Sequence, residues 1–187
     1  MPKLPAFFKL PNEQMVELRF FRPSDAELLF AYGEALSETT KKRFAPHSFD
    51  KITIRTICEH LPNENACRLV AVLSDDGSIV GYFIGIFGVS ANDKLRLTQQ
   101  GIGVNEDLWV SFAPSIRDDF QQMGLGKLMF DRLLAEVKRK GKQQMVLLGG
   151  VQQDNVQAIA YYQKLGFKNA GHFFRGEVLN VTMWRKI

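Results

Sequence analysis

Hydrophobic positions that alternate, or recur at helical intervals, predict the elements in the first part of the chain. Residues 16–22 alternate and are rich in apolar and aromatic side chains, which is typical of a strand. Residues 24–27 have the Ser-x-x-Glu spacing of a capping box, and apolar residues at helical intervals follow them. We therefore expect a helix over 25–36, and a second helix over 50–61 that ends before Pro62.

Two strongly apolar segments in the middle of the chain predict an antiparallel hairpin. Residues 68–74 and 79–89 are rich in β-branched and aromatic side chains, and Asp75-Asp76-Gly77 between them favours a tight turn. Residues 90–106 are polar and contain two glycines, so we interpret them as a long loop that is functional or mobile. Strand character returns over 108–116.

The second half of the chain contains the clearest helical pattern. Residues 122–140 place seven apolar side chains at helical spacing, and a short buried strand is predicted over 145–151. Another helix follows over 154–165, and residues 167–187 predict two strands joined by a turn. The sequence has no repeat, linker or low-complexity segment, so we expect one mixed α/β domain over 1–187.

Composition and charge narrow the classes of protein. The 187 residues are 45% hydrophobic and 24% charged, which is typical of a globular chain that can bury a core. Glycines interrupt the longest apolar run, so we expect no membrane span, and residues 1–8 predict an ordered or frayed tail rather than a signal peptide. Two cysteines without CxxC spacing predict no metal site and a reducing, cytoplasmic location.

The net charge of +4 is mild and does not by itself imply nucleic acid. The sequence has no stripe of arginine and aromatic residues, and the basic cluster 138–142 is explained by cations at the C-terminus of a helix. An anionic small molecule accounts for the charge, so we expect no nucleic-acid partner.

The segment Gln121-Gln122-Met123-Gly124-Leu125-Gly126 follows a predicted strand and opens the long helix. Glycines let the backbone turn sharply there, and the free N–H groups and dipole of the helix favour an anion, which predicts a phosphate-binding loop. It is not a Walker A loop, because Leu128 stands where Ser or Thr is needed. It is not a dinucleotide fingerprint, because Met129 stands at the third glycine.

This loop, together with Asn155 and the run Ala158-Ile159-Ala160-Tyr161-Tyr162-Gln163-Lys164-Leu165-Gly166-Phe167, resembles the GNAT superfamily of N-acetyltransferases. The resemblance is strong over 108–167, and residues 18–25 are similar to the first strand and helix cap of many members. It implies an α/β (α+β) fold with a central mixed, mostly antiparallel twisted sheet of about seven strands, flanked by about four helices.

The resemblance also implies acetyl-CoA as co-substrate. Backbone amides of the loop would hold the pyrophosphate, and the strand over 109–118 would splay beside the thioester. Asn155 would bond the pantetheine arm, although a helix N-cap is its alternative role. Lys127, Arg132 and Lys164 are candidates for the ribose phosphate, or lie on solvated helix faces. The implied cofactor-binding residues are Ser115, Ile116, Gln121, Gln122, Met123, Gly124, Leu125, Gly126, Lys127, Asn155 and Tyr162.

The implied reaction is direct attack of a primary amine on the thioester through a tetrahedral intermediate. Tyr162 is the expected general acid to the CoA thiolate, and its neighbour Tyr161 is the better candidate for simple packing. A backbone N–H near 113–116 would meet the oxyanion. Glu106 and Asp107 are the expected catalytic bases, Asp118 and Asp119 are alternatives, and ordinary surface carboxylates remain an open interpretation of all four.

The acceptor is the least specified part of the interpretation. Residues 36–44 are similar to a segment of the first helical region in several members, and Arg43, Phe44 and Arg175 are the expected substrate-binding residues. A small-molecule amine and a protein or peptide amine both stay open, as does a homodimer. The alternative function is a catalytically reduced domain that binds CoA as a sensor or interaction module.

Overall fold

The computed structural model describes residues 4–44 and 46–187, which divide into two compact units. The first unit comprises Met1–Gly85 with Ala113–Glu136, and the second comprises Ile86–Phe112 with Val137–Ile187. The single domain expected over 1–187 stays a prediction.

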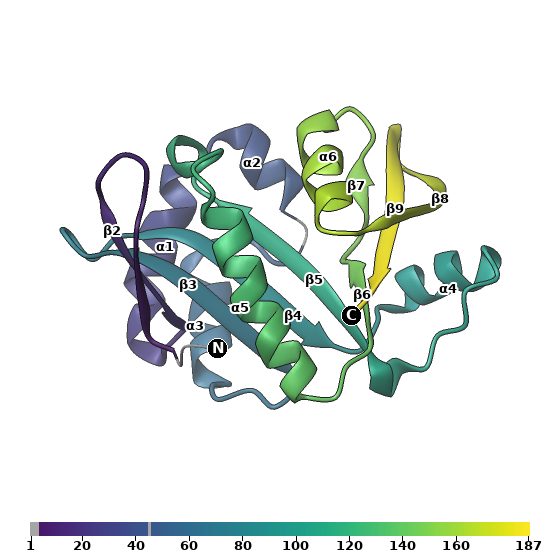
Figure 1. Ribbon diagram of the computed structural model, residues 1–187, viewed down its shortest axis with the longest axis horizontal. Coiled ribbons are helices and arrows are strands. Elements are labelled where there is room, and N and C mark those ends of the chain that lie inside the picture. Colours follow the sequence, from purple (N-terminus) through teal and green to yellow (C-terminus); the bar gives the residue numbers. More distant parts are fainter. Residues whose placement is uncertain (1–3, 45) are drawn as a thin grey trace. The chain divides into compact units, whose positions relative to one another are not determined.

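The first unit contains a sheet whose paired strands run antiparallel (Figure 1). Ala6 pairs with Leu18 and Val16 with Leu73, which fixes the register of its first three strands. The expected tail is ordered in part, because residues 6–9 form the edge strand. The strands are β1 (Ala6–Lys9), β2 (Met15–Phe20), β3 (Ala66–Leu73), most of β4 (Ile79–Phe87) and the second half of β5 (Trp109–Ile116).

Helices cover both faces of this sheet, with α5 on one face and α1 and α3 on the other (Figure 1). Successive side chains of a strand point to opposite faces, and two residues of β4 show this directly. A Cβ on Gly81 would lie 2.6 Å from the Met129 sulfur of α5, whereas the Tyr82 ring contacts Phe49 on the other face. The helices are α1 (Ala26–Ala35), α2 (Glu38–Arg43), α3 (Lys51–Glu59) and most of α5 (Leu125–Arg139).

The starts of these helices follow local capping rules, with one correction to the sequence prediction. Ser37 and Asp50 accept N–H bonds from the first turns of α2 and α3. The capping box predicted at 24–27 is wrong, because a short 3-10 turn precedes α1 and the cap residue Asp25 makes no cap bond. The Asp25 carboxylate instead accepts the Arg22 N–H at 2.8 Å and forms a buried ion pair with Arg19.

The second unit contains one parallel strand pair among antiparallel ones (Figure 1). Trp109 of β5 pairs with Gln144 of β6, and the last bond of this ladder runs from the Leu148 N–H to the Phe112 carbonyl at 2.9 Å. β6 and β7 both pair with β9, and β8 pairs with β9 across a bulge. Besides the first half of β5, the strands are β6 (Gln144–Leu147), β7 (Val151–Gln152), β8 (Lys168–Arg175) and β9 (Val178–Lys186).

Two helices belong to the second unit, and one of them corrects the sequence prediction. Residues 90–106 are not one long loop, because α4 (Ala91–Gln99) forms within them and contacts β8 and β9. Ser90 caps this helix by accepting the Asp93 N–H, and Leu97 is fully buried beside Trp109. The burial of Leu97 and the Ser90 cap therefore stabilise a helix in a segment whose polar composition favoured a loop. The other helix is α6 (Val156–Lys164).

The fold class predicted from the sequence is confirmed. The described residues form nine strands and six α-helices, so both counts are higher than the expected numbers of about seven strands and about four helices. The short helix α2 was not predicted as a separate element. Within the part of the chain that the structure describes, no helix is long and apolar enough to cross a membrane.

Candidate functional site

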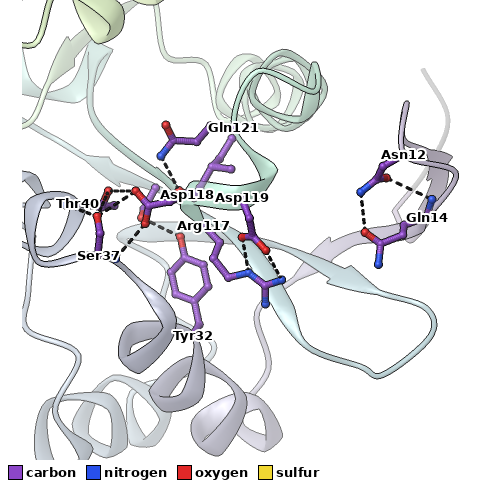
Figure 2. Close-up of polar contacts among 11 residues, drawn as sticks. Asn12, Gln14, Tyr32, Ser37, Thr40, Arg117, Asp118, Asp119 and Gln121 are labelled. Carbon is purple, nitrogen blue, oxygen red and sulfur yellow. Dashed lines mark hydrogen bonds and ion pairs between the residues drawn. The ribbon is translucent and has the colours of Figure 1, made fainter.

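The predicted phosphate loop lies in the first unit, between the end of β5 and the start of α5. Gln122 and Gly124 both have positive φ, at 61° and 81°, so the chain is not helical until Leu125. This explains why α5 begins three residues later than predicted. On the strand side, the Gln121 side chain donates to the Ile116 carbonyl at 3.2 Å, as Figure 2 shows.

The backbone of this loop fits an anion such as a diphosphate. The Lys127 and Leu128 N–H groups both donate to the Gly124 carbonyl, at 3.1 and 3.2 Å, so the N–H groups before them precede the first helical bonds. When residues with positive φ lie among residues with negative φ, successive backbone N–H groups point toward the same concave side of the loop. A Cβ on Gly124 would meet nothing within 4 Å, which leaves open space beside the loop.

The cationic side chains near the loop already have partners. Lys127 pairs with Asp131 one turn along α5, at 2.5 Å, and Arg132 lies over the Phe8 ring at 5.2 Å. Both pairs are in the first unit. The anion contacts predicted for this loop would therefore come mainly from its main-chain N–H groups.

The second half of β5 is fixed to α1 by a buried hydrogen bond. The hydroxyls of Tyr32 and Ser115 are 2.7 Å apart (Figure 2). Burial raises the pKa of Tyr32, so its hydroxyl stays protonated at ordinary pH. The Ser115 side chain is engaged in this way, and the contact expected of Ser115 with a cofactor stays a prediction.

Asp118, an alternative base in the sequence interpretation, joins the segment after β5 to the start of α2 (Figure 2). Its carboxylate accepts the Ser37 N–H at 2.9 Å, the Ser37 hydroxyl at 3.0 Å and the Thr40 hydroxyl at 2.6 Å. Desolvation by itself would raise the pKa of Asp118, but these bonds together lower it. The other alternative, Asp119, forms a two-point ion pair with Arg117 at 2.8 and 3.0 Å.

Aromatic rings gather beside α2 in the first unit. Phe44, which caps the C-terminus of α2, lies 4.9 Å from the Phe49 ring and 5.3 Å from the His47 ring, measured between centroids. Tyr82 of β4 lies 5.7 Å from His47 and closes the group. We call Phe44, His47, Phe49 and Tyr82 the aromatic cluster. Phe44 was an expected acceptor contact, and its neighbour Arg43 is the exposed last residue of α2.

Asn155 and Tyr162 are placed in the second unit by α6. Asn155 is the N-cap of the helix and accepts the Ala158 N–H at 3.3 Å. The cap uses only Oδ1, so the Nδ2 donors are left for another partner. Tyr162 packs 5.7 Å from Phe167, and burial raises the pKa of its phenol. The phenol is therefore neutral and carries its proton, and the same burial makes it a weaker acid than an exposed tyrosine.

The remaining expected site residues also lie in the second unit. Glu106 pairs with Lys94 at 2.6 Å, and both side chains are about half exposed. The Asp107 carbonyl accepts a bond from Lys142 at 2.8 Å. Arg175 donates to the Gly149 carbonyl at 2.9 Å. The catalytic roles of Glu106 and Asp107 and the acceptor role of Arg175 stay predictions.

Neither the contacts of His47 nor the Tyr32–Ser115 bond was predicted from the sequence. A bond between residues 83 positions apart leaves no local signal in a sequence. For His47 a weak signal exists, because aromatic residues at positions 44 and 49 surround it within six residues.

Comparison with known proteins places the chain in a family. The family model described as "Acetyltransferase (GNAT) family" matches residues 31–167, while no curated protein matches the chain. The GNAT domain of PAT from S. lividans is 17% identical, with a TM-score of 0.74 over 97% of this chain and 96% of that one. YncA from Salmonella typhimurium, solved with acetyl-CoA, is 20% identical, with a TM-score of 0.67 over 91% and 93%.

A third solved structure is a spermidine N-acetyltransferase chimera of SpeG from Vibrio cholerae and hSSAT. It is 16% identical, with a TM-score of 0.66 over 91% of this chain and 95% of that one. At these identities the likeness establishes the fold, and the family match covers well over half of the sequence. The chain belongs to the acetyltransferase (GNAT) family.

Proposed function

We propose that this protein is an N-acetyltransferase that moves the acetyl group of acetyl-CoA to a primary amine. The observation that carries the proposal is the loop at the head of α5, where Gln122 and Gly124 have positive φ and open space adjoins the backbone. Membership of the family and the likeness to YncA, which was solved with acetyl-CoA, support it.

The proposed contacts with acetyl-CoA use backbone groups of two segments and one side-chain amide. The backbone amides over 121–127 bind the pyrophosphate, mainly through 122–126, because the Gln121 and Lys127 N–H groups already donate to the Asp118 and Gly124 carbonyls, at 3.4 and 3.1 Å. The backbone of Ser115 and Ile116 meets the pantetheine arm, since the Ser115 hydroxyl bonds to Tyr32. Asn155 donates to the arm through Nδ2, as its Oδ1 caps α6.

The proposed reaction balances in atoms and protons. Acetyl-CoA supplies an activated carbonyl carbon; the amine nitrogen forms a bond to it, and the carbon–sulfur bond breaks through a tetrahedral intermediate. Tyr162 donates its phenolic proton to the leaving sulfur and is reprotonated by solvent. An ammonium acceptor thus yields an amide and a thiol and releases one proton.

The acceptor ammonium has to lose a proton before its nitrogen can attack. Glu106 and Asp107 stay the sequence-based predictions for the group that takes this proton. The Glu106 carboxylate forms an ion pair with Lys94.

The proposed acceptor contacts are Arg43, Phe44 and Arg175, and the proposed acceptor is a small-molecule amine or a protein amine. Aromatic side chains beside Phe44 favour a cationic amine through the negative faces of their rings. We further propose a cytoplasmic location, which the free thiols of Cys58 and Cys67 support.

The test is release of free thiol from acetyl-CoA in the presence of polyamines, amino sugars, amino acids and peptides, with the acetylated product identified by mass spectrometry. We expect release with at least one class of amine. A rise in melting temperature with acetyl-CoA but no release with any amine would identify a CoA-binding sensor instead. Absence of both would contradict the proposal as a whole.

A further inference from the structure

His47 presents a proton-accepting nitrogen inside the first unit. Its Nδ1 lies 2.8 Å from the Ser48 carbonyl, and a carbonyl only accepts, so Nδ1 carries the hydrogen of the neutral ring. Nε2 is then the nitrogen with a lone pair. It is buried and has no hydrogen-bond partner among the residues that the structure describes. A buried acceptor without a donor calls for an explanation.

The groups around His47 keep the ring neutral. Burial is the largest influence and lowers the pKa of His47, and the positive charge of Arg68 on β3 lowers it further. The Ser48 carbonyl and Asp50, the N-cap of α3, act in the opposite direction but do not outweigh burial. Tyr82 of β4 faces the ring and accepts a bond from Arg68 at 3.1 Å. His47 is therefore a base at pH 7 rather than a cation.

The aromatic cluster is tied to β5, the strand proposed to run beside the thioester. The Arg117 N–H, just after β5, donates to the Val80 carbonyl of β4 at 3.0 Å. In an antiparallel register that continues from this pair, Ser115 of β5 and Tyr82 of β4 lie opposite each other, because each lies two residues from this pair along its strand. Tyr32 makes a second connection, because it bonds Ser115 and its ring lies 5.7 Å from that of Phe49. His47 contacts both Tyr82 and Phe49.

We propose that His47 Nε2 is the proton acceptor for the attacking ammonium, with the rings of Phe44, Phe49 and Tyr82 binding that cation. The inference rests on the proposed acyl transfer and gives His47 the role that the sequence predicted for Glu106 or Asp107. The rings suit a cation because each presents a negative face, and the effect is strongest where water is excluded.

The proton step is simple. One N–H bond of the ammonium breaks, its proton forms a bond with Nε2, and the nitrogen keeps the electron pair with which it attacks the acetyl carbon. The imidazolium then passes this proton to solvent. Because Nε2 itself is buried, the amine reaches it when one half-buried ring, Phe44 or Phe49, turns aside while keeping its face toward the cation, and Tyr82 is fully buried and stays in place.

The test compares wild type with His47→Asn, in which the Asn amide can still donate to the Ser48 carbonyl but no basic nitrogen replaces Nε2. Thiol release is measured at saturating acetyl-CoA with an amine that the panel identifies. We expect kcat/KM to fall by about 100-fold at pH 7.5, as for loss of a general base. The melting-temperature rise caused by acetyl-CoA should be unchanged.

The ratio of the two rates against pH separates a base from a structural residue. Ionisation of the amine affects both proteins equally and cancels in the ratio. Below pH 6.5, the ordinary His value, wild-type His47 becomes protonated as the pH passes its lowered pKa, so the ratio should fall toward one. A ratio that stays constant from pH 5 to 8, as lost packing would give, overturns the proposal.

His60→Asn is the matched control, because His60 also bonds a backbone carbonyl through Nδ1, at 2.7 Å from Thr56, but is exposed. It should leave the rate unchanged. In His47→Gly, added imidazole should restore part of the lost rate. An unchanged rate in His47→Asn overturns the role of His47 alone. No thiol release by wild type with any amine contradicts the proposed function, and the role of His47 with it.

Discussion

The hydroxyls of Tyr32 and Ser115 lie 2.7 Å apart inside the first unit, and this bond joins the helix α1 to the second half of β5. Tyr32 also contacts Phe49 of the aromatic cluster. One buried residue thus supports both the strand proposed to run beside the donor and the cluster proposed to bind the acceptor.

Tyr32→Phe should destabilise the protein by about 1–2 kcal/mol, because it leaves the buried Ser115 hydroxyl without its partner. Denaturant unfolding measures the change. The Tyr32→Phe/Ser115→Ala double variant should lose less than the sum of the two single variants, since it removes both polar groups. Strictly additive losses would show that the two hydroxyls do not depend on each other.

Gly124→Ala should weaken acetyl-CoA binding at least 10-fold and lower stability by about 1 kcal/mol, because a Cβ is strained at a φ of 81° even with open space around it. Titration calorimetry and unfolding measure the two effects. Gly77→Ala is the matched control, since Gly77 has a φ of 73° and equally open surroundings in the β3–β4 turn. It should lose similar stability and keep its affinity; equal affinity losses in both variants would exclude a specific role for the loop.

Asp118→Asn should lower stability by less than about 1 kcal/mol near neutral pH, because the carboxylate is exposed and solvent screens it. The pKa of Asp118 is lowered from 3.8 in the folded state, so its contribution is present above that value and disappears as the pH falls through the lowered pKa. Wild type and variant should therefore converge below pH 3.8 in acid unfolding. A difference that grows toward low pH would contradict this account of the bonds to Ser37 and Thr40.

Tyr162→Phe should lower kcat by about 100-fold and leave acetyl-CoA affinity within about 2-fold, because only the proton donor is lost. Burial raises the pKa of Tyr162, so the phenol stays protonated through pH 9 and gives no alkaline fall in rate there. Tyr161→Phe, on the same helix, serves as the control and should retain its rate. Equal rates for wild type and Tyr162→Phe would remove the acid role.

The fold was largely predictable because local patterns carry most of it. The apolar repeat over 122–140 identified α5, and the apolar segments on either side of Asp75-Asp76-Gly77 identified β3 and β4. The helix α4 was missed because its composition is polar, and its single fully buried apolar residue, Leu97, depends on a tertiary contact with Trp109. A tertiary contact of this kind overrides weak local preference.

The candidate site could be proposed from the sequence only where local patterns indicate it. The loop over 121–127 was proposed from its glycines, and Asn155 from a resemblance, with a helix N-cap as its alternative role; the structure shows the N-cap, and the binding roles of both stay predictions. The partners of Asp118 and the unpaired nitrogen of His47 arise from contacts between distant segments or from burial, which residue spacing does not encode.

The most direct test of the central claim is amide NMR of the protein titrated with acetyl-CoA. If main-chain N–H groups hold the diphosphate, the largest shifts and the strongest protection from exchange should occur at the amides of residues 121–127. Pantetheine, which lacks the diphosphate, should leave these amides unaffected. Binding of acetyl-CoA that leaves the amides of 121–127 unperturbed would contradict the account.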